Sequence, residues 1–486
     1  MADPSVSSVL SVFSVVTGSY HFAFERFFSR STLNESTPGG SLMRTVIAAL
    51  MLTLALGAQA ESLIFENVRL VDVEKASVSE PTRVGVRDGF VVDADSIDPA
   101  EADEIVETAG YLIPGLAEMH AHVPPMRAGE QRVNDTLMLW LAHGMTTIRG
   151  MLGEPGHLTL RQQLADGEIP GPRLITSGPS FNGSSVSSPE GARRMTLAQH
   201  EAGYDLLKLH PGLWPEVFDV IAQTADRLGI DYSGHVSVAV GVDRVLESDQ
   251  GTIDHLDGYA QKMVPEDHEL HGTDPGLFGV NLIEGMNAER IPELARRTAE
   301  AGVANVPTQS LVENWATGDV EALMQRDAMR WIPADMAARW RERVKQLRQS
   351  YDSEEGAQRY VELRRRLIRE LHEAGALILA GADSPQILSI PGDAIHHELA
   401  IYVEAGLSPA EALATATTNV ADYLGETNRG CLEPGCVADV VLLENNPLED
   451  IGNTRSIQGV MRAGEWFDRE RLDAALEAIA ERAGET

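Results

Sequence analysis

Between Gly110 and Gly425 the chain repeats one local pattern, in which a helical segment ends at a glycine and a short apolar run follows. Glycine at a helix end can adopt the left-handed conformation that closes the last turn, where a Cβ would cost energy. The runs that follow are short and mostly apolar, which is typical of buried parallel strands. The glycines that we interpret as helix caps are Gly144, Gly203, Gly229, Gly251, Gly302 and Gly375.

Two further runs complete the pattern: GYLIPGLAEMHAHV at 110–123 and PRLITSG at 172–178. Together with the six runs after the glycines they give eight strand candidates, each followed by helix. Eight such units predict an α/β fold, a (β/α)8 TIM barrel over residues 110–429. A doubly wound open sheet would show the same alternation, although eight units favour closure.

Two flanking regions do not fit the barrel pattern. Residues 62–109 and 430–467 read as short strands joined by turns, among them a turn at Asp88-Gly89. Neither region has enough apolar residues for a core of its own. We expect one small β-sandwich built from both chain ends, followed by a C-terminal helix over residues 468–486.

The start of the chain has the three parts of an export signal in order. Met43-Arg44 precedes an apolar run at 46–58, and Ala58-Gln59-Ala60 resembles a cleavage site. We interpret residues 43–60 as a signal peptide and residues 1–42 as a non-native upstream extension or a disordered segment. The expected location is secreted or periplasmic. The alternative is a mobile N-terminal tail with a short buried helix.

Charge and cysteine content exclude several classes of protein. The sequence has 39 Lys+Arg against 73 Asp+Glu, a formal net charge of -34. A surface this acidic repels phosphate backbones and anionic lipids, so we expect no nucleic-acid partner and no membrane anchor. The two cysteines, Cys431 and Cys436, exclude a disulfide framework. They either pair after secretion or remain reduced.

Polar side chains collect where the predicted strands end. His120 and His122 are two residues apart, so in a strand both imidazoles face one way. The residues at the ends of later strands are Lys208, His235, His255 and Asp383. In barrels this is the face on which active sites are built. Imidazole and carboxylate groups suit zinc or a similar divalent ion, and a lysine among them fits only if it is neutralised or modified.

These residues carry a family resemblance. PGLAEMHAHV, with the later Lys, His, His and Asp, resembles the amidohydrolase superfamily, and GCLEPGCVADVVLLENNPLEDI resembles its closing sandwich. The similarity covers about residues 62–467 and is strongest to the imidazolonepropionase-like and Xaa-Pro dipeptidase-like hydrolases. Relatives often have Arg-Asp after the second strand, whereas this chain has Arg149-Gly150.

The resemblance implies a binuclear centre. Carbon dioxide carboxylates Lys208, which then bridges two divalent ions, Zn²⁺ being the expected metal. His120, His122 and Asp383 hold one ion, and His235 and His255 hold the other. A metal-bound hydroxide attacks the carbonyl, while Asp383 takes its proton and passes it to the leaving amine. Relatives of this branch also imply a homo-oligomer.

Contacts to substrate are less well defined by the sequence. His210 lies two residues after Lys208 and either contacts substrate or caps its strand. Arg193 and Tyr259 are candidates to bind a substrate carboxylate, as are Arg194 and Lys262, the alternative being solvated surface groups.

The predicted function is hydrolysis of an amide or peptide C–N bond in a small molecule, by a dipeptidase or a carboxypeptidase-like enzyme acting on N-acyl amino acids. One alternative is hydrolysis of a cyclic amide or lactone at the same centre. Another is a non-catalytic protein that retains metal, against which Asp383 argues because a structural site needs no proton shuttle.

Overall fold

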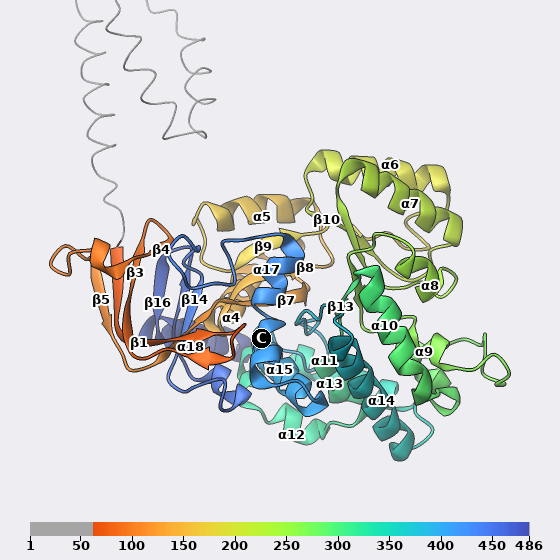
Figure 1. The fold of residues 1–486 in the computed structure, drawn as a ribbon. Helices are drawn as coiled ribbons and strands as arrows, with labels where there is room; N and C mark the ends of the chain where they lie inside the picture. The colour runs from red at the N-terminus through yellow and green to blue at the C-terminus, as the bar shows by residue number, and fades with distance from the viewer. Residues whose placement is uncertain (1–61, 486) are drawn as a thin grey trace, which may run out of the picture. The chain divides into compact units, whose positions relative to one another are not determined.

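The first and last strands of the described residues meet in one nine-stranded sheet with the order β16-β15-β14-β6-β1-β3-β4, in which β2 and β5 also pair with β1. The computed structural model describes residues 62–485, so the predicted signal peptide and upstream segment lie outside the described residues. Figure 1 shows the first strands, in red and orange, beside the last strands, in dark blue. The strands of this terminal sheet are β1 (Ser62–Asp72), β2 (Ser77–Val78), β3 (Thr82–Arg87), β4 (Phe90–Val92), β5 (Glu104–Glu107), β6 (Tyr111–Pro114), β14 (Val440–Leu443), β15 (Ile457–Arg462) and β16 (Glu465–Asp468).

The terminal sheet takes one strand that the sequence pattern assigned to the barrel. β6 pairs with β1 and β14, whereas β7 (Leu116–Ala121) pairs with a parallel strand, β8. Gly115 separates the two strands, and its N–H donates to the Asp439 carbonyl over 2.8 Å. The run at 110–123, which we predicted as one strand, is therefore two strands in different sheets. The turn at Asp88-Gly89 is confirmed, with φ of 53° and 79° between β3 and β4.

The parallel strands lie in two groups. β7-β8-β9 form one sheet and β10-β11-β12-β13 form another. Isolated parallel bridges join Ser177 to Leu206, Asn305 to Ile378 and Ala121 to Ser384. The strands after β7 are β8 (Met145–Gly150), β9 (Arg173–Thr176), β10 (Leu206–Leu209), β11 (Asp231–Gly234), β12 (Thr252–Asp254) and β13 (Ala304–Val306).

The eighth predicted strand, after Gly375, is not a regular strand. Only Ile378 and Ser384 make bridges to its neighbours. Asp383 has φ of 57°, a left-handed conformation that interrupts an extended run. The segment nevertheless lies beside β7, because the Met119 N–H donates to the Ala380 carbonyl and the Asp383 N–H to the His120 carbonyl.

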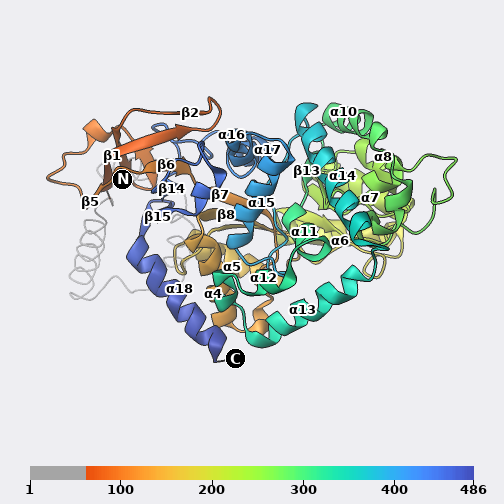
Figure 2. The same ribbon diagram turned by 90° about the horizontal axis from the view of Figure 1, so that it is seen from below.

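Helices flank these strands in both views (Figures 1 and 2). The predicted C-terminal helix is confirmed as α18 (Arg469–Gly484). The other helices are α4 (Glu130–Ala142), α5 (Pro155–Ala165), α6 (Pro189–Ala202), α7 (Pro215–Leu228), α8 (Gly241–Leu246), α9 (Tyr259–Met263), α10 (Ile291–Ala301), α11 (Gln309–Ala316), α12 (Val320–Met324), α13 (Ala334–Arg348), α14 (Glu354–Glu373), α15 (Asp393–Ala405), α16 (Pro409–Ala414) and α17 (Thr418–Leu424).

Five of the six predicted cap glycines have a left-handed backbone, and Gly251 is the exception. α8 ends at Leu246 with Glu247 as its C-cap, and Gly251 instead directly precedes β12. A Cβ there would lie 2.2 Å from Asp231 Oδ1 and 2.5 Å from the Tyr423 hydroxyl. Gly251 is thus required for close approach of neighbouring side chains, rather than for a helix cap.

Two further features of the described residues are a disulfide and the character of the helices. Cys431 and Cys436 form a disulfide in the segment between α17 and β14. Among residues 62–485, no helix combines the length and the apolar character needed to cross a bilayer.

Candidate metal centre

The six predicted ligands come from the carboxyl ends of neighbouring strands. His120 lies in β7 and His122 directly follows it, while Lys208 lies in β10. His235 follows β11, which pairs in parallel with β10, and His255 follows β12, which pairs in parallel with β11 in the same sheet. Parallel strands place their carboxyl ends at one edge, so these side chains meet. We call the set His120, His122, Lys208, His235, His255 and Asp383 the ligand cluster.

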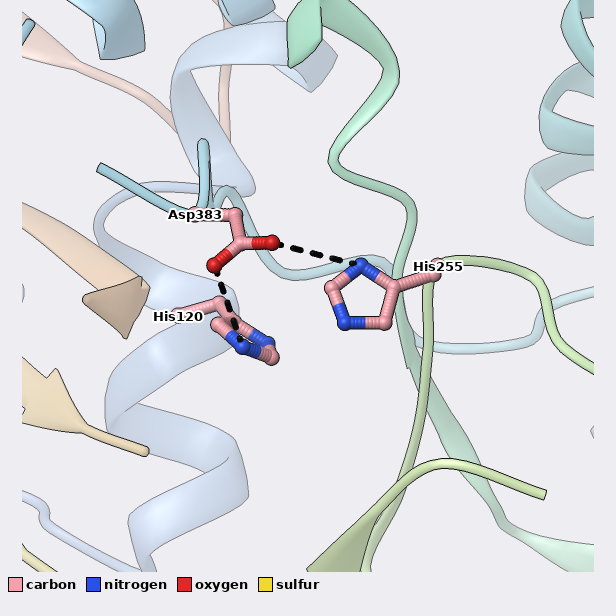
Figure 3. Close-up of side chains that lie close together, drawn as sticks. All are labelled: His120, His255 and Asp383. Atoms are coloured by element: carbon pink, nitrogen blue, oxygen red, sulfur yellow. Dashed lines mark ion pairs between the residues drawn. The ribbon is translucent and has the colours of Figure 1, made fainter. Parts of the chain in front are cut away.

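Asp383 lies at the centre of this cluster. Its Oδ1 is 2.6 Å from His122 Nε2 and 3.6 Å from His120 Nε2, and its Oδ2 is 3.9 Å from His255 Nδ1. Figure 3 shows the two carboxylate oxygens directed to different imidazoles. Gln386 Nε2 donates to Oδ1 over 2.8 Å. One carboxylate therefore contacts three of the four predicted imidazole ligands.

The donor atoms are close enough for a metal ion. Ligand atoms of His120, His255 and Asp383 all lie within 4.8 Å of one another. The His235 ring centroid is 4.5 Å from that of His255. Lys208 Nζ is 3.5 Å from His120 Nε2, and the lysine is fully buried. The structure thus brings all six residues of the cluster together.

Burial shifts three of the nitrogen ligands toward their uncharged forms. It lowers the pKa of His120 to about 4, with a further contribution from Lys208. It also holds the pKa of His255 well below the usual value and lowers the pKa of Lys208. Neutral imidazole coordinates divalent ions, and an uncharged amine is the form that reacts with carbon dioxide.

Asp383 is ionised despite its environment. Burial alone would raise the pKa of Asp383, but the His122 and His120 rings outweigh this and lower it to about 2. A carboxylate beside several imidazole nitrogens is a donor set that suits a borderline divalent ion such as Zn²⁺.

Acidic side chains that the sequence analysis missed support the histidines. His235 Nδ1 lies 2.7 Å from Asp257 Oδ2, and His120 Nδ1 lies 2.9 Å from Asp254 Oδ2. Both acids stand beside His255 in the sequence TIDHLDG. Their position close to His255 in the sequence was the signal that could have identified these two acids. The histidines that they contact, His235 and His120, belong to other strands, so the sequence did not show the pairing.

Glu118 holds the segment that carries Asp383. It accepts hydrogen bonds from Trp140 Nε1 over 2.6 Å and from Ser384 Oγ over 2.9 Å. The Ser384 backbone N–H also donates to Glu118, over 3.2 Å. Since Ser384 follows Asp383, these bonds fix the position of the central carboxylate.

An aromatic side chain covers one side of the cluster. The Phe278 ring stacks on His255 with centroids 4.7 Å apart, and on Trp315 at 5.8 Å. Phe278 has φ of 52° in the long segment between α9 and α10. The Tyr360 hydroxyl donates to the backbone carbonyl of Phe278 over 2.7 Å. Such strained backbone persists only where surrounding contacts hold it.

The predicted substrate-contact residues lie in different positions relative to the ligand cluster. The His210 ring stacks on His235 at 4.9 Å, so His210 borders the cluster, and burial lowers its pKa to about 2. Tyr259 is fully buried, and its hydroxyl bonds to Thr298 and Asn305, so the structure does not bring it to the cluster. Arg193 is an exposed residue of α6. The other basic candidates form surface ion pairs, Lys262 with Asp243 and Arg194 with Glu190.

Comparison with known proteins agrees with this arrangement. Residues 111–467 match the model of the amidohydrolase family. An imidazolonepropionase from Deinococcus deserti is 34% identical over 100 residues, which are 20% of this chain and 25% of that protein. The chain thus aligns with about a quarter of the length of this curated relative.

Solved structures show the same fold. A bottromycin amidohydrolase has a TM-score of 0.67 at 23% identity, over 93% of this chain and 95% of its own. A Xaa-Pro dipeptidase with methionine bound in its active site has a TM-score of 0.59 at 17% identity, over 84% of this chain and 100% of its own. Ochratoxinase from A. niger has a TM-score of 0.60 at 18% identity, over 84% and 96%.

The fold is that of a hydrolase family whose members are generally metal-dependent, and the cluster includes three residues whose ligand atoms could hold an ion. The chain belongs to the amidohydrolase family. This membership classes it as a hydrolytic enzyme acting on C–N bonds.

Proposed function

We propose that this enzyme hydrolyses the amide or peptide bond of small substrates, as a dipeptidase or a carboxypeptidase-like enzyme acting on N-acyl amino acids. The observation that carries the proposal is the convergence of His120, His255 and Asp383, whose ligand atoms lie within 4.8 Å of one another. Lys208 is buried, and its Nζ lies 3.5 Å from His120 Nε2. As a carbamate, Lys208 would add a ligand for a second ion to these three residues.

In this proposal the cluster would hold two divalent ions. His120, His122 and Asp383 would hold one ion, His235 and His255 would hold the other, and Lys208, as a carbamate, would be a further ligand. Zn²⁺ is the metal that this mixture of imidazole and carboxylate favours. When bound, the ions acidify a water and polarise the scissile carbonyl.

Asp383 moves the proton. Its pKa of about 2 leaves it ionised at neutral pH, so it can accept the proton of the attacking water. The amine leaves only after it gains a proton, and the same carboxyl is placed to supply it. Gln386, which donates to Oδ1, and His122 orient the carboxylate for both steps.

The substrate class rests on the relatives. A structural neighbour is a Xaa-Pro dipeptidase with bound methionine, and another is an amidohydrolase. The stacked pair Phe278 and Trp315 adds an apolar wall next to His255, against which an apolar substrate side chain can pack.

We also propose that the parallel strands close into a (β/α)8 barrel and that the terminal strands pack as a sandwich. The isolated bridges at Ser177–Leu206, Asn305–Ile378 and Ala121–Ser384 support closure, because they join the two sheets and the eighth segment in a ring.

Export from the cytoplasm is a further part of the proposal. The disulfide between Cys431 and Cys436 supports it, since such bonds persist in oxidising compartments. N-terminal mass spectrometry of the expressed protein tests it. The expected mature product begins at Glu61, and a product that begins earlier contradicts secretion.

The activity is tested with a library of dipeptides, N-acyl amino acids, cyclic amides and lactones, using protein loaded with Zn²⁺ in bicarbonate. Hydrolysis of the linear amides is the expected result. Turnover of only cyclic amides or lactones would contradict the proposed substrate class but would still agree with the proposed metal centre.

Asp383→Asn separates catalysis from metal retention. At saturating Zn²⁺, where the other five residues of the ligand cluster still bind metal, we expect activity lowered by at least 100-fold, because general acid–base catalysis contributes about 10²–10⁴. Asp219→Asn, in an exposed ion pair with Arg244, is the matched control and should keep its activity. Metal-loaded parent protein that is inactive on the whole library supports a metal-retaining role without catalysis.

A further inference from the structure

A fully buried carboxylate outside the ligand cluster contacts two of its members. Asp254, the last residue of β12, has 0% exposure. Its Oδ2 lies 2.9 Å from His120 Nδ1 and 3.2 Å from Lys208 Nζ. The same oxygen therefore meets nitrogen atoms that come from β7 and β10.

The contact to His120 determines which ring nitrogen can bind metal. A neutral imidazole carries one N–H, and a carboxylate beside Nδ1 favours the tautomer with hydrogen there. The lone pair is then at Nε2, the atom that lies 3.6 Å from Asp383 Oδ1. Asp254 thus turns the free lone pair of His120 toward the centre of the cluster.

The contact to Lys208 has a second consequence. Carboxylation joins Nζ to the carbon of carbon dioxide and releases one proton, so the carbamate nitrogen keeps a single N–H. Asp254 Oδ2, at 3.2 Å from Nζ, is placed to accept it. The new anionic group then points away from Asp254, because two like charges repel each other.

A buried arginine offsets the charge of Asp254. Arg149 Nη2 lies 3.7 Å from Asp254 Oδ1, and Thr252 Oγ1 donates to that oxygen over 2.7 Å. Arg149 is itself held by the Met119 carbonyl at 2.8 Å and by the Tyr423 hydroxyl at 3.1 Å. A buried carboxylate is tolerated when it is paired and hydrogen-bonded in this way.

We propose that Asp254 is a positioning residue of the metal centre, which fixes the tautomer of His120 and the orientation of the Lys208 carbamate. The proposal rests on the function proposed above, since it requires carboxylation of Lys208. In this proposal Asp254 Oδ2 contacts the two ligands, and Asp254 Oδ1 contacts Thr252 and Arg149.

Asp254→Asn tests the assignment, with Asp231→Asn as the matched control. Asp231 accepts from the Tyr423 hydroxyl over 2.9 Å, in the same polar network, and is not one of the residues paired with the ligand cluster. The affinity for Zn²⁺ is measured by competition with a chromophoric chelator. The carbamate is measured by ¹³C NMR after incubation with ¹³C-bicarbonate.

We expect Asp254→Asn to weaken Zn²⁺ binding by about 10- to 100-fold and to reduce the carbamate signal, since loss of such partners has this effect on metal sites. Asp231→Asn should leave both unchanged. Equal Zn²⁺ affinity and carbamate signal in Asp254→Asn and parent would overturn the proposal.

A measurement on the parent enzyme guards against misfolding of the variant. The ¹⁵N shifts of the His120 ring, assigned by comparison with His120→Gln, should show a protonated Nδ1 and an unprotonated Nε2. The opposite tautomer overturns the proposal even if Asp254→Asn does not fold.

The outcomes also separate this proposal from the proposed function. A parent enzyme that binds metal, carries the carbamate and hydrolyses amides, with Asp254→Asn unaltered, removes only the role of Asp254. A parent that binds metal and carries the carbamate without hydrolysing the library removes the function, while the affinity and NMR measurements still decide on Asp254. A parent with no metal overturns both.

Discussion

The ring of Phe278 lies flat on the ring of His255, with centroids 4.7 Å apart and an interplanar angle of 20°. His255 is one of two ligands expected to hold the second ion, so an aromatic wall restricts its motion. Stacked pairs contribute about 0.5–1.5 kcal/mol beyond burial.

Phe278→Ala should therefore weaken metal binding at the His235 and His255 position. The expected loss is about 2- to 12-fold, which is the stacking energy expressed as a ratio. Chelator competition measures it. Leu277→Ala is the control, because Leu277 is adjacent and 43% exposed. Equal losses in the two variants would show that the stack has no specific effect.

Metal binding should stabilise the fold. An ion that binds only the native state at 100 times its Kd adds about 2.7 kcal/mol. For a chain of this size we expect calorimetry to show a rise in Tm of roughly 3 °C on addition of Zn²⁺ to chelator-treated protein. Ca²⁺, which prefers oxygen ligands, should have little effect. Equal shifts with both ions would indicate surface binding instead of the nitrogen-rich cluster.

Asp393, the first residue of α15, should make stability depend on pH. Burial opposes its ionisation, but Arg455 and then His143 hold its pKa below the usual value. Because folding lowers this pKa, its contribution is present above the unfolded value of about 3.9 and is lost as pH falls through the folded value.

We expect Asp393→Asn to lower the free energy of unfolding by about 1–3 kcal/mol at neutral pH. The difference from the parent should shrink below a pH of about 4. Urea midpoints at several pH values measure both effects. Asp219→Asn, whose ion pair with Arg244 is exposed, should change stability by less than about 1 kcal/mol. A penalty that stays constant down to acid pH would exclude the ionic origin.

The ligand cluster was predictable because each ligand stands near a strand end that the sequence itself marks. Lys208 and His235 follow glycines that end helices, and those glycines have the predicted left-handed backbone. His120 and His122 alternate along a buried strand. Local periodicity was sufficient for these positions, since the parallel arrangement then brings the strand ends together.

The supporting contacts could not be predicted in the same way. Arg149 in β8 approaches Asp254 in β12 across the interior, and no local pattern relates two such residues. Phe278 lies in a long segment without periodicity, and its left-handed backbone is unusual for an aromatic residue. The buried position of Tyr259, bonded to Thr298 and Asn305, could not be told from the sequence, because a tyrosine near a site and a tyrosine in a core have the same sequence signature.

Asp257 offers a test of the division between the two ions. His235 Nδ1 lies 2.7 Å from Asp257 Oδ2, and both side chains are 11% exposed. A carboxylate at this nitrogen fixes the ring and makes the other nitrogen a better ligand. Asp257→Asn should therefore weaken the ion at His235 and His255 by about 10- to 100-fold, while the ion at His120, His122 and Asp383 remains. Metal analysis after gel filtration should fall from about two toward one per chain, whereas Asp219→Asn keeps the parent value. Loss of both ions together would mean that the cluster binds them as one unit, contrary to the division proposed here.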